Sequence, residues 1–235
     1  MSREITKKDG DQIKSGPLNR RSFIKYAGAS AGVAALVVSG CNDDDDKKNN
    51  DGVDLGSGDT GILNYAYALE QLEAAFYTTV VAHGAFTTTF SASEQAILRD
   101  IRDHEIAHRE FFKAALGDNA IQDLEVDFST VNFGNRDSVL MTARTFEDLG
   151  VSAYNGAGNL LIDGNLLLVA GKIVSVEARH AAAIRDLLNP KSTDFAGDAV
   201  VDANGFDGAL MPSEVLSAAD PFIKTKVNGT NLPTA

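Results

Sequence analysis

The sequence predicts an all-α protein built on a four-helix bundle with a long crossover between the second and third helices. Three observations support this fold class: the period of the apolar residues, the lengths of the connections, and two pairs of repeated motifs. Four segments carry apolar residues at intervals of three and four, which is the period of an amphipathic helix. Two helical hairpins joined by a crossover are therefore expected.

Capping residues and helix breakers mark the ends of these helices. The expected helices are Ile62 to about His83, Ser91 or Ser93 to Gly117, Asp137 or Ser138 to about Asn155, and Asp163 to about Leu188. Connections of about eight residues join the first to the second helix and the third to the fourth, which suits antiparallel neighbours. Residues 118–135 lack a helical period and could extend roughly 50 Å, enough to run the length of a helix.

The second and fourth helices carry matching Glu-x-x-His motifs. Four residues in one recur in type and spacing in the other: Ile101, Glu105, His108 and Phe112 against Ile173, Glu177, His180 and Ile184. A Glu and a His three residues apart share one face of a helix, here the face expected in the core. An unpaired carboxylate there would cost several kcal/mol, and a metal ion is the simplest compensating charge.

The first and third helices carry a second repeat. Glu70 and Tyr77 are seven residues apart, as are Glu147 and Tyr154. A carboxylate-bridged two-metal site takes one Glu from each of two helices and a Glu-x-x-His from each of the other two. The sequence supplies all six.

On these motifs, residues 60–190 resemble the ferritin-like superfamily. In ferritins, bacterioferritins and rubrerythrins the first-helix Glu is often followed seven residues later by Tyr, and the run LEQLEAAFY is similar to that of exported bacterial ferritin-like domain proteins. The resemblance implies a ferritin-like four-helix bundle that binds two iron ions, or manganese, with Glu105 and Glu177 as bridging carboxylates. The implied metal ligands are Glu70, Glu105, His108, Glu147, Glu177 and His180.

Several neighbouring residues have more than one interpretation. Glu73 follows Glu70 by three residues and could share its inward face, although the spacing to Tyr77 favours Glu70. His104 is either a hydrogen-bond donor behind the ligands or a partly exposed helix residue. Tyr77 and Tyr154 either hydrogen-bond the carboxylates or carry an electron, or they are core tyrosines with one satisfied hydroxyl.

Residues 1–40 resemble an export signal. Arg20 and Arg21 precede an apolar run, residues 26–38, that is similar to a twin-arginine signal and is short for a membrane span. Residues 38–41 resemble a lipobox, in which cleavage before Cys41 leaves that cysteine to be lipidated. Alternatively, Cys41 is an ordinary small residue in a membrane anchor. Both interpretations place the rest of the chain outside the cytoplasm.

The expected organisation after the signal is a flexible acidic tether (41–59), the bundle (60–190), and an extension (191–235) that packs on the bundle with a short helix at 213–219. The run CNDDDD resembles the acidic signal of surface lipoproteins, although a solvated linker has the same composition. We therefore expect a membrane-anchored lipoprotein of the cell envelope, with the outer-membrane surface as one location.

Composition narrows the function. Beyond residue 40 the chain has 14 Lys or Arg against 30 Asp or Glu, which disfavours nucleic-acid binding. The single cysteine excludes a disulfide framework and a Cys-x-x-Cys iron site within the chain, so a rubrerythrin-type reaction would need a separate electron donor. Imidazole and carboxylate ligands suit iron or manganese.

These features favour ferroxidase or peroxidase chemistry with dioxygen or peroxide as the small-molecule substrate, and a homodimer is a compatible assembly. A lipid tether and a C-terminal extension make an iron-storage cage awkward to close. The alternative is a non-catalytic surface lipoprotein that uses a metal-free ferritin-like bundle as a binding or stress-protective module.

Overall fold

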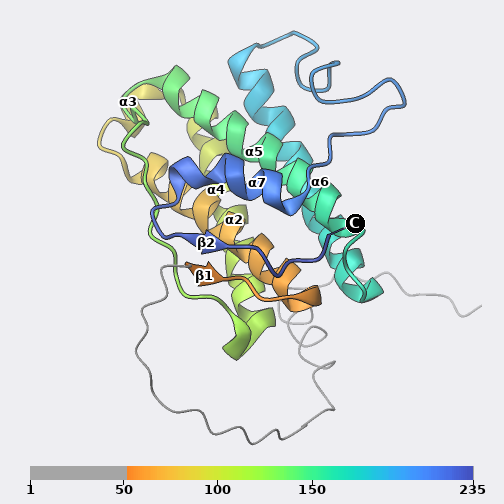
Figure 1. The fold of residues 1–235 in the computed structure, drawn as a ribbon. Helices are drawn as coiled ribbons and strands as arrows, with labels where there is room; N and C mark the ends of the chain where they lie inside the picture. Colours follow the sequence, from red (N-terminus) through yellow and green to blue (C-terminus); the bar gives the residue numbers. More distant parts are fainter. Residues whose placement is uncertain (1–51, 235) are drawn as a thin grey trace, which may run out of the picture. The chain divides into compact units, whose positions relative to one another are not determined.

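The computed structural model describes residues 52–234 (Figure 1). Its elements are β1 (Val53–Asp54), α2 (Gly58–Ala82), α3 (Phe86–Thr89), α4 (Ala92–Leu116), η1 (Gly117–Asn119), α5 (Arg136–Gly158), α6 (Gly164–Leu188), α7 (Pro212–Ala219), η2 (Asp220–Phe222) and β2 (Val227–Asn228). The four long helices confirm the predicted all-α class. Arg20, Arg21 and Cys41, and with them the predicted signal and lipid site, lie outside the described residues.

The four long helices form two hairpins. Helix α2 packs along α4, and α5 packs along α6, while α2 also contacts α5 and α4 contacts α6. The long connection from α4 to α5 runs over the bundle and joins the two hairpins (Figure 1). The arrangement is the one predicted, with every long helix presenting one face to a common centre.

Capping side chains begin three of these helices. Ser91 caps α4 through a reciprocal capping box with Glu94, so the structure selects Ser91 over Ser93. Helix α5 begins at Arg136, one residue before Asp137 and two before Ser138, the two starts predicted from sequence, because Asn135 is its cap and accepts a hydrogen bond from the Ser138 amide. Asp163 caps α6 as predicted.

The ordered bundle reaches further toward the N-terminus than the tether boundary that the sequence suggested. Residues 53–54 form β1, which pairs in parallel with β2, and α2 begins at Gly58. Leu55 is fully buried. The β1–β2 pairing joins residues more than 170 positions apart in the sequence, so no local sequence pattern predicts it.

The C-terminal extension lies against α5 through a close backbone contact. The Leu210 amide donates a hydrogen bond to the Ser152 carbonyl, 3.0 Å away. A Cβ atom at Gly156 would lie 1.8 Å from the Leu210 carbonyl oxygen, so only glycine fits there. Val215 and Ala219 of α7 are fully buried and complete this contact.

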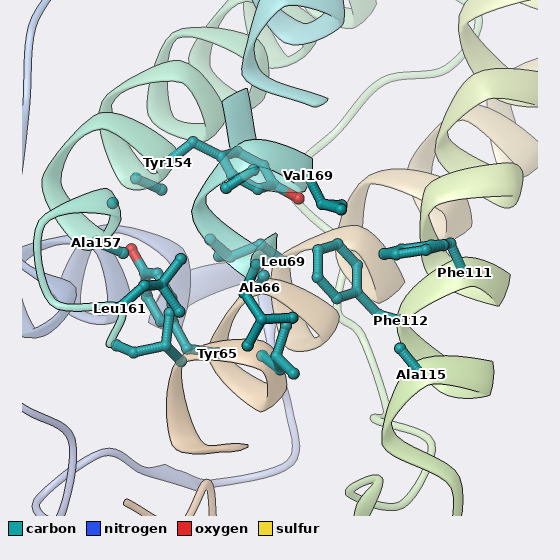
Figure 2. A pocket seen from close by; sticks show the side chains of 16 residues that line it. Tyr65, Ala66, Leu69, Phe111, Phe112, Ala115, Tyr154, Ala157, Leu161 and Val169 are labelled. Atoms are coloured by element: carbon teal, nitrogen blue, oxygen red, sulfur yellow. The ribbon is translucent and has the colours of Figure 1, made fainter. Parts of the chain in front are cut away.

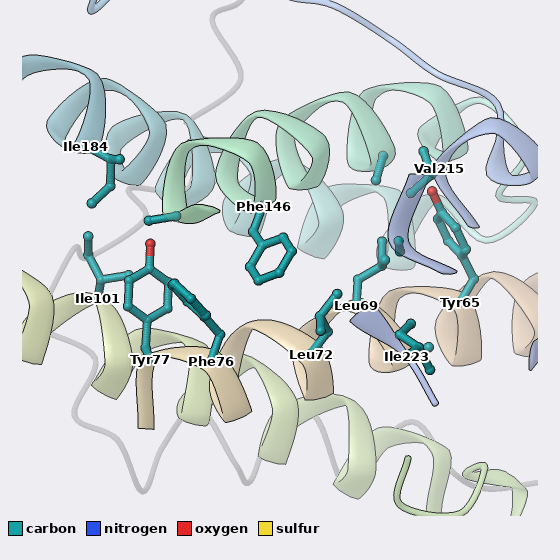
Figure 3. Close-up of a cluster of buried hydrophobic side chains, with 14 of the residues drawn as sticks. Tyr65, Leu69, Leu72, Phe76, Tyr77, Ile101, Phe146, Ile184, Val215 and Ile223 are labelled. Carbon is teal, nitrogen blue, oxygen red and sulfur yellow. The ribbon is translucent and has the colours of Figure 1, made fainter. Parts of the chain in front are cut away.

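Aromatic side chains fill the core between α2 and α5. The ring centroids of Phe76 and Phe146 are 5.1 Å apart, and Phe222 of the extension packs on Phe146 at 4.7 Å. Figure 3 shows Phe76 and Tyr77 of α2 pointing toward α5, with Ile101 and Ile184 beside Tyr77. Among the helices of residues 52–234, none combines the length and the apolar character needed to span a membrane.

Candidate metal centre

Each of the four long helices places at least one ionisable side chain at the centre of the bundle. The four carboxylates predicted as metal ligands have no exposed surface, His180 is 5% exposed, and the His108 side chain is 13% exposed. The structure thus brings together the six residues named from the sequence. They are Glu70 on α2, Glu105 and His108 on α4, Glu147 on α5, and Glu177 and His180 on α6.

A first group of ligand atoms surrounds His108. Its Nδ1 atom lies 3.4 Å from Glu70 Oε2, 3.4 Å from Glu105 Oε2 and 2.9 Å from Glu177 Oε1. One ligand atom from each of these four residues lies within 4.8 Å of all the others. We call this group the first subsite.

A second group surrounds His180. Its Nδ1 atom lies 2.8 Å from Glu105 Oε1, 3.4 Å from Glu147 Oε2 and 3.5 Å from Glu177 Oε2. We call this group the second subsite. Glu105 and Glu177 each turn one oxygen toward each subsite, whereas Glu70 and Glu147 each contribute to one. This division of oxygens is the one that bridging and terminal carboxylates need.

The hydrogen-bonding state of these atoms shows that the residues fit metal ions. In residues 52–234, the buried side-chain oxygens and nitrogens without a hydrogen-bond partner belong to these six residues, with the Tyr65 hydroxyl as the single exception. Such atoms are normally paired in a protein interior. Four carboxylates carry four negative charges, which two divalent cations would balance while both imidazoles stay neutral. The cluster could therefore hold metal.

The pKa values reflect the same crowding. Burial raises the pKa of Glu105 to about 8, with Glu177 adding to the effect, and burial raises that of Glu147 to about 7. For Glu177 the neighbouring histidines outweigh burial and lower the pKa to about 2. Burial alone would lower the pKa of His180, but the surrounding carboxylates raise it to about 12. Without a metal ion, protons on these groups therefore compensate the buried negative charge that a bound cation would compensate.

Two tyrosines orient the terminal carboxylates across the bundle. Tyr77 of α2 donates a hydrogen bond to Glu147 Oε1, and Tyr154 of α5 donates one to Glu70 Oε1. Each bond occupies one oxygen and leaves Oε2 of the same carboxylate facing its subsite. Hydrogen bonding to the carboxylates was one of the roles that the sequence left open.

The structure also separates Glu73 from Glu70. Glu73 is 4% exposed and belongs to neither subsite; a Cβ atom at Gly150 would lie only 3.1 Å from its Oε1 atom. Burial and the neighbouring carboxylates, Glu105 first, raise its pKa well above the usual range. Sequence reasoning missed Gly150, whose only signal is a glycine in the middle of an amphipathic helix.

His104 contacts the second subsite from the solvent-exposed side of the bundle. Its Nδ1 atom lies 2.9 Å from Nε2 of His180, and the two rings stack with centroids 5.2 Å apart. His104 itself is exposed. It therefore meets both descriptions given from the sequence, being a solvent-exposed helix residue and a partner that orients the imidazole of His180.

Comparison with known proteins agrees with this geometry. A family model described as a ferritin-like domain matches residues 58–190, which is more than half of the chain and includes all six residues of the cluster. No match was found among curated proteins. The chain therefore belongs to the ferritin-like domain family.

Proposed function

We propose that this protein binds a dinuclear iron centre, with manganese as the alternative metal, and uses it in ferroxidase- or peroxidase-type chemistry. The observation that supports the proposal is the pair of four-atom ligand groups that share Glu105 and Glu177. The lack of hydrogen-bond partners for the inward atoms of the same residues supports it further. Oxygen and imidazole donors with no sulfur suit iron or manganese better than soft metals.

Two ferrous ions would together supply two electrons, the number that reduces dioxygen to hydrogen peroxide or hydrogen peroxide to water. The side chains of the protein provide the setting for this reaction. Glu105 and Glu177 hold negative charge between the subsites, while Tyr77 and Tyr154 fix the direction of the terminal carboxylates. His104 connects His180 Nε2 to solvent, which gives a proton at that atom a path out of the bundle.

We further propose that the protein works outside the cytoplasm, held at a membrane of the cell envelope by lipid on Cys41. The basic pair Arg20–Arg21, the short apolar run and the lipobox-like residues 38–41 support this location. A polar segment of about ten residues between Cys41 and β1 would separate the bundle from the lipid surface.

Metal content and single-turnover kinetics test the proposed reaction. The purified protein, loaded anaerobically with ferrous iron, should hold about two ions per chain. Mixing with dioxygen or peroxide in a stopped-flow instrument should then give a ferric absorbance faster than ferrous iron alone does, and Glu177→Ala should lose this effect. A wild-type protein that stays metal-free, or that oxidises iron no faster than buffer does, would overturn the proposal.

A further inference from the structure

An apolar pocket opens at the end of the bundle where α2 and α6 begin and α4 and α5 end. Its cavity volume is about 40 Å³, and all four long helices line it (Figure 2). We propose that this pocket binds an uncharged, largely apolar organic molecule and places it beside the first metal subsite.

The pocket lies directly next to the metal cluster. Its lining includes Ala66, four residues before Glu70 on α2, and Phe112, four residues after His108 on α4. Residues four apart lie one turn apart on the same helix face, so the pocket continues the face that carries the first subsite. Tyr154 forms part of the wall and also donates a hydrogen bond to Glu70. A bound molecule would therefore touch the side chain that orients a terminal ligand.

The internal repeat shows that this opening is specific to one half of the protein. Tyr77 occupies the equivalent position in the other half, where it is fully buried, with Ile101 and Ile184 beside it (Figure 3). Tyr154 instead borders the pocket, with the Phe112 ring 6.5 Å away. The two halves have matching candidate ligands, but the pocket adjoins Tyr154 and not Tyr77. The pocket therefore has a role that metal binding alone does not require.

The lining defines the chemistry of the ligand. Leu, Ile, Val, Ala and Phe side chains make up most of the wall, and no charged residue lines it. Two tyrosines supply its hydroxyl groups, and that of Tyr65 is buried without a hydrogen-bond partner. A charged molecule would lose its hydration there without compensation. An uncharged, largely apolar molecule would lose little hydration there.

Residues that adjoin the lining residues in the sequence are also apolar and exposed. Leu166 lines the pocket, and the next two residues of α6, Leu167 and Leu168, are 46% and 62% exposed. Ile162, in the turn before α6, is 87% exposed. Exposed apolar side chains clustered beside a pocket are typical of surfaces that receive apolar ligands.

Fluorescent ligand binding tests the pocket independently of iron chemistry. The probe is N-phenyl-1-naphthylamine, an uncharged apolar dye, titrated into the full-length protein with and without iron. The dye should bind in both states, and 1-decanol should displace it at least about tenfold better than decanoate does at about pH 8, where the carboxylate is ionised. No dye binding, or equal displacement by the two compounds, would overturn the proposal.

Variants locate the binding. Ala66→Leu fills the pocket from α2, and Ala115→Phe narrows its mouth from the exposed end of α4. Each should weaken dye binding about tenfold. Ala114→Phe makes the same change at the adjacent exposed residue, which does not line the pocket, and should stay within about twofold of wild type. Unchanged dye affinity in Ala115→Phe, or in an Ala66→Leu protein that melts cooperatively, would contradict the assignment.

The placement of the ligand beside a bound metal ion rests on the proposed function, but its binding to the pocket does not. Dye binding by a protein that takes up no iron would support the pocket and overturn only the proposed function. Iron uptake and oxidation by a protein that does not bind the dye would support the proposed function and overturn the proposed binding pocket.

Discussion

The two subsites predict different metal stoichiometries for variants of the four ligand carboxylates. Glu105 and Glu177 each contribute to both subsites, whereas Glu70 and Glu147 each contribute to one. Alanine at a bridging position should therefore remove both ions, and alanine at a terminal position should remove one. Each subsite offers four ligand atoms, so every substitution removes one of the four from each subsite that it affects.

The size of the effect follows from ligand loss. Losing a residue that only orients a ligand typically weakens metal binding by about 10- to 100-fold, so losing a ligand should cost at least about 100-fold. At free ferrous iron about tenfold above the wild-type Kd, wild type should hold about 1.8 ions per chain. The terminal variants should then hold about 1.0 and the bridging variants about 0.2.

Thermal unfolding gives a second measure of the same difference. At this iron concentration each site should stabilise the folded state by about 1.4 kcal/mol, so two sites raise Tm by roughly 6–11 °C in a domain of this size. The terminal variants should show about half of that shift and the bridging variants almost none.

The measurement is anaerobic ferrous titration with elemental analysis and calorimetry of the same samples. Glu110→Ala is the matched control, because Glu110 is an exposed glutamate on α4 outside both subsites. It should behave as wild type. Equal loss of iron in all four carboxylate variants, or a single ion retained by Glu105→Ala, would refute the assignment of bridging and terminal roles.

Three further predictions follow from the geometry. Because Glu105 and His180 retain protons at pKa values above those of the unfolded chain, ferrous affinity should rise at least about tenfold per pH unit from pH 6 to 8. Over the same pH range the free energy of unfolding of the metal-free protein should fall, by about 1.4 kcal/mol per pH unit for each proton that the folded chain retains and the unfolded chain has lost. Iron titrations and thermal melts at each pH test whether affinity rises while stability falls. Gly156→Ala should destabilise the protein by more than about 2 kcal/mol in urea unfolding, because its Cβ meets the Leu210 carbonyl, while Gly158→Ala should have little effect. His104→Ala should weaken iron binding about tenfold through the loss of support for His180, with His104→Gln retaining part of the affinity; equal affinities would exclude this role.

The sequence was sufficient for the four helices and for the convergence of the six buried side chains, because both follow from helical periodicity. A Glu-x-x-His on an apolar stripe must point into the bundle, and two hairpins with a crossover bring four such faces together. The cluster formed by Glu105, His108, Glu177 and His180 needed no further information. The helix bounds in the structure differ from the predicted ones by a few residues, because several neighbouring side chains could each cap the same helix.

Features that depend on contacts between distant segments were beyond the sequence. The Leu55 amide donates a hydrogen bond to the Asn228 carbonyl of the C-terminal extension, next to the β1–β2 pair. The spacing to Tyr77 favoured Glu70 from the sequence, but the place of Glu73 could not be predicted, because it lies against Gly150 of another helix. The pocket was likewise invisible, because an alanine such as Ala66 has the same apolar character whether it faces a packed core or a cavity.

The internal repeat explains why the two subsites need not act alike. His104 contacts His180 of the second subsite, and Val176 occupies the equivalent position in the other Glu-x-x-His helix, so the second subsite has a neighbouring imidazole that the repeat does not provide for the first. The pocket meets the first subsite through Tyr154, while Tyr77 is enclosed in the aromatic core. We propose that the duplicated residues supply two similar ion positions, and that the unequal surroundings give the second subsite a hydrogen-bonded imidazole and the first a contact with an organic molecule. In Ala66→Leu we therefore expect changed spectra or reactivity for the iron in the first subsite, with the second less affected.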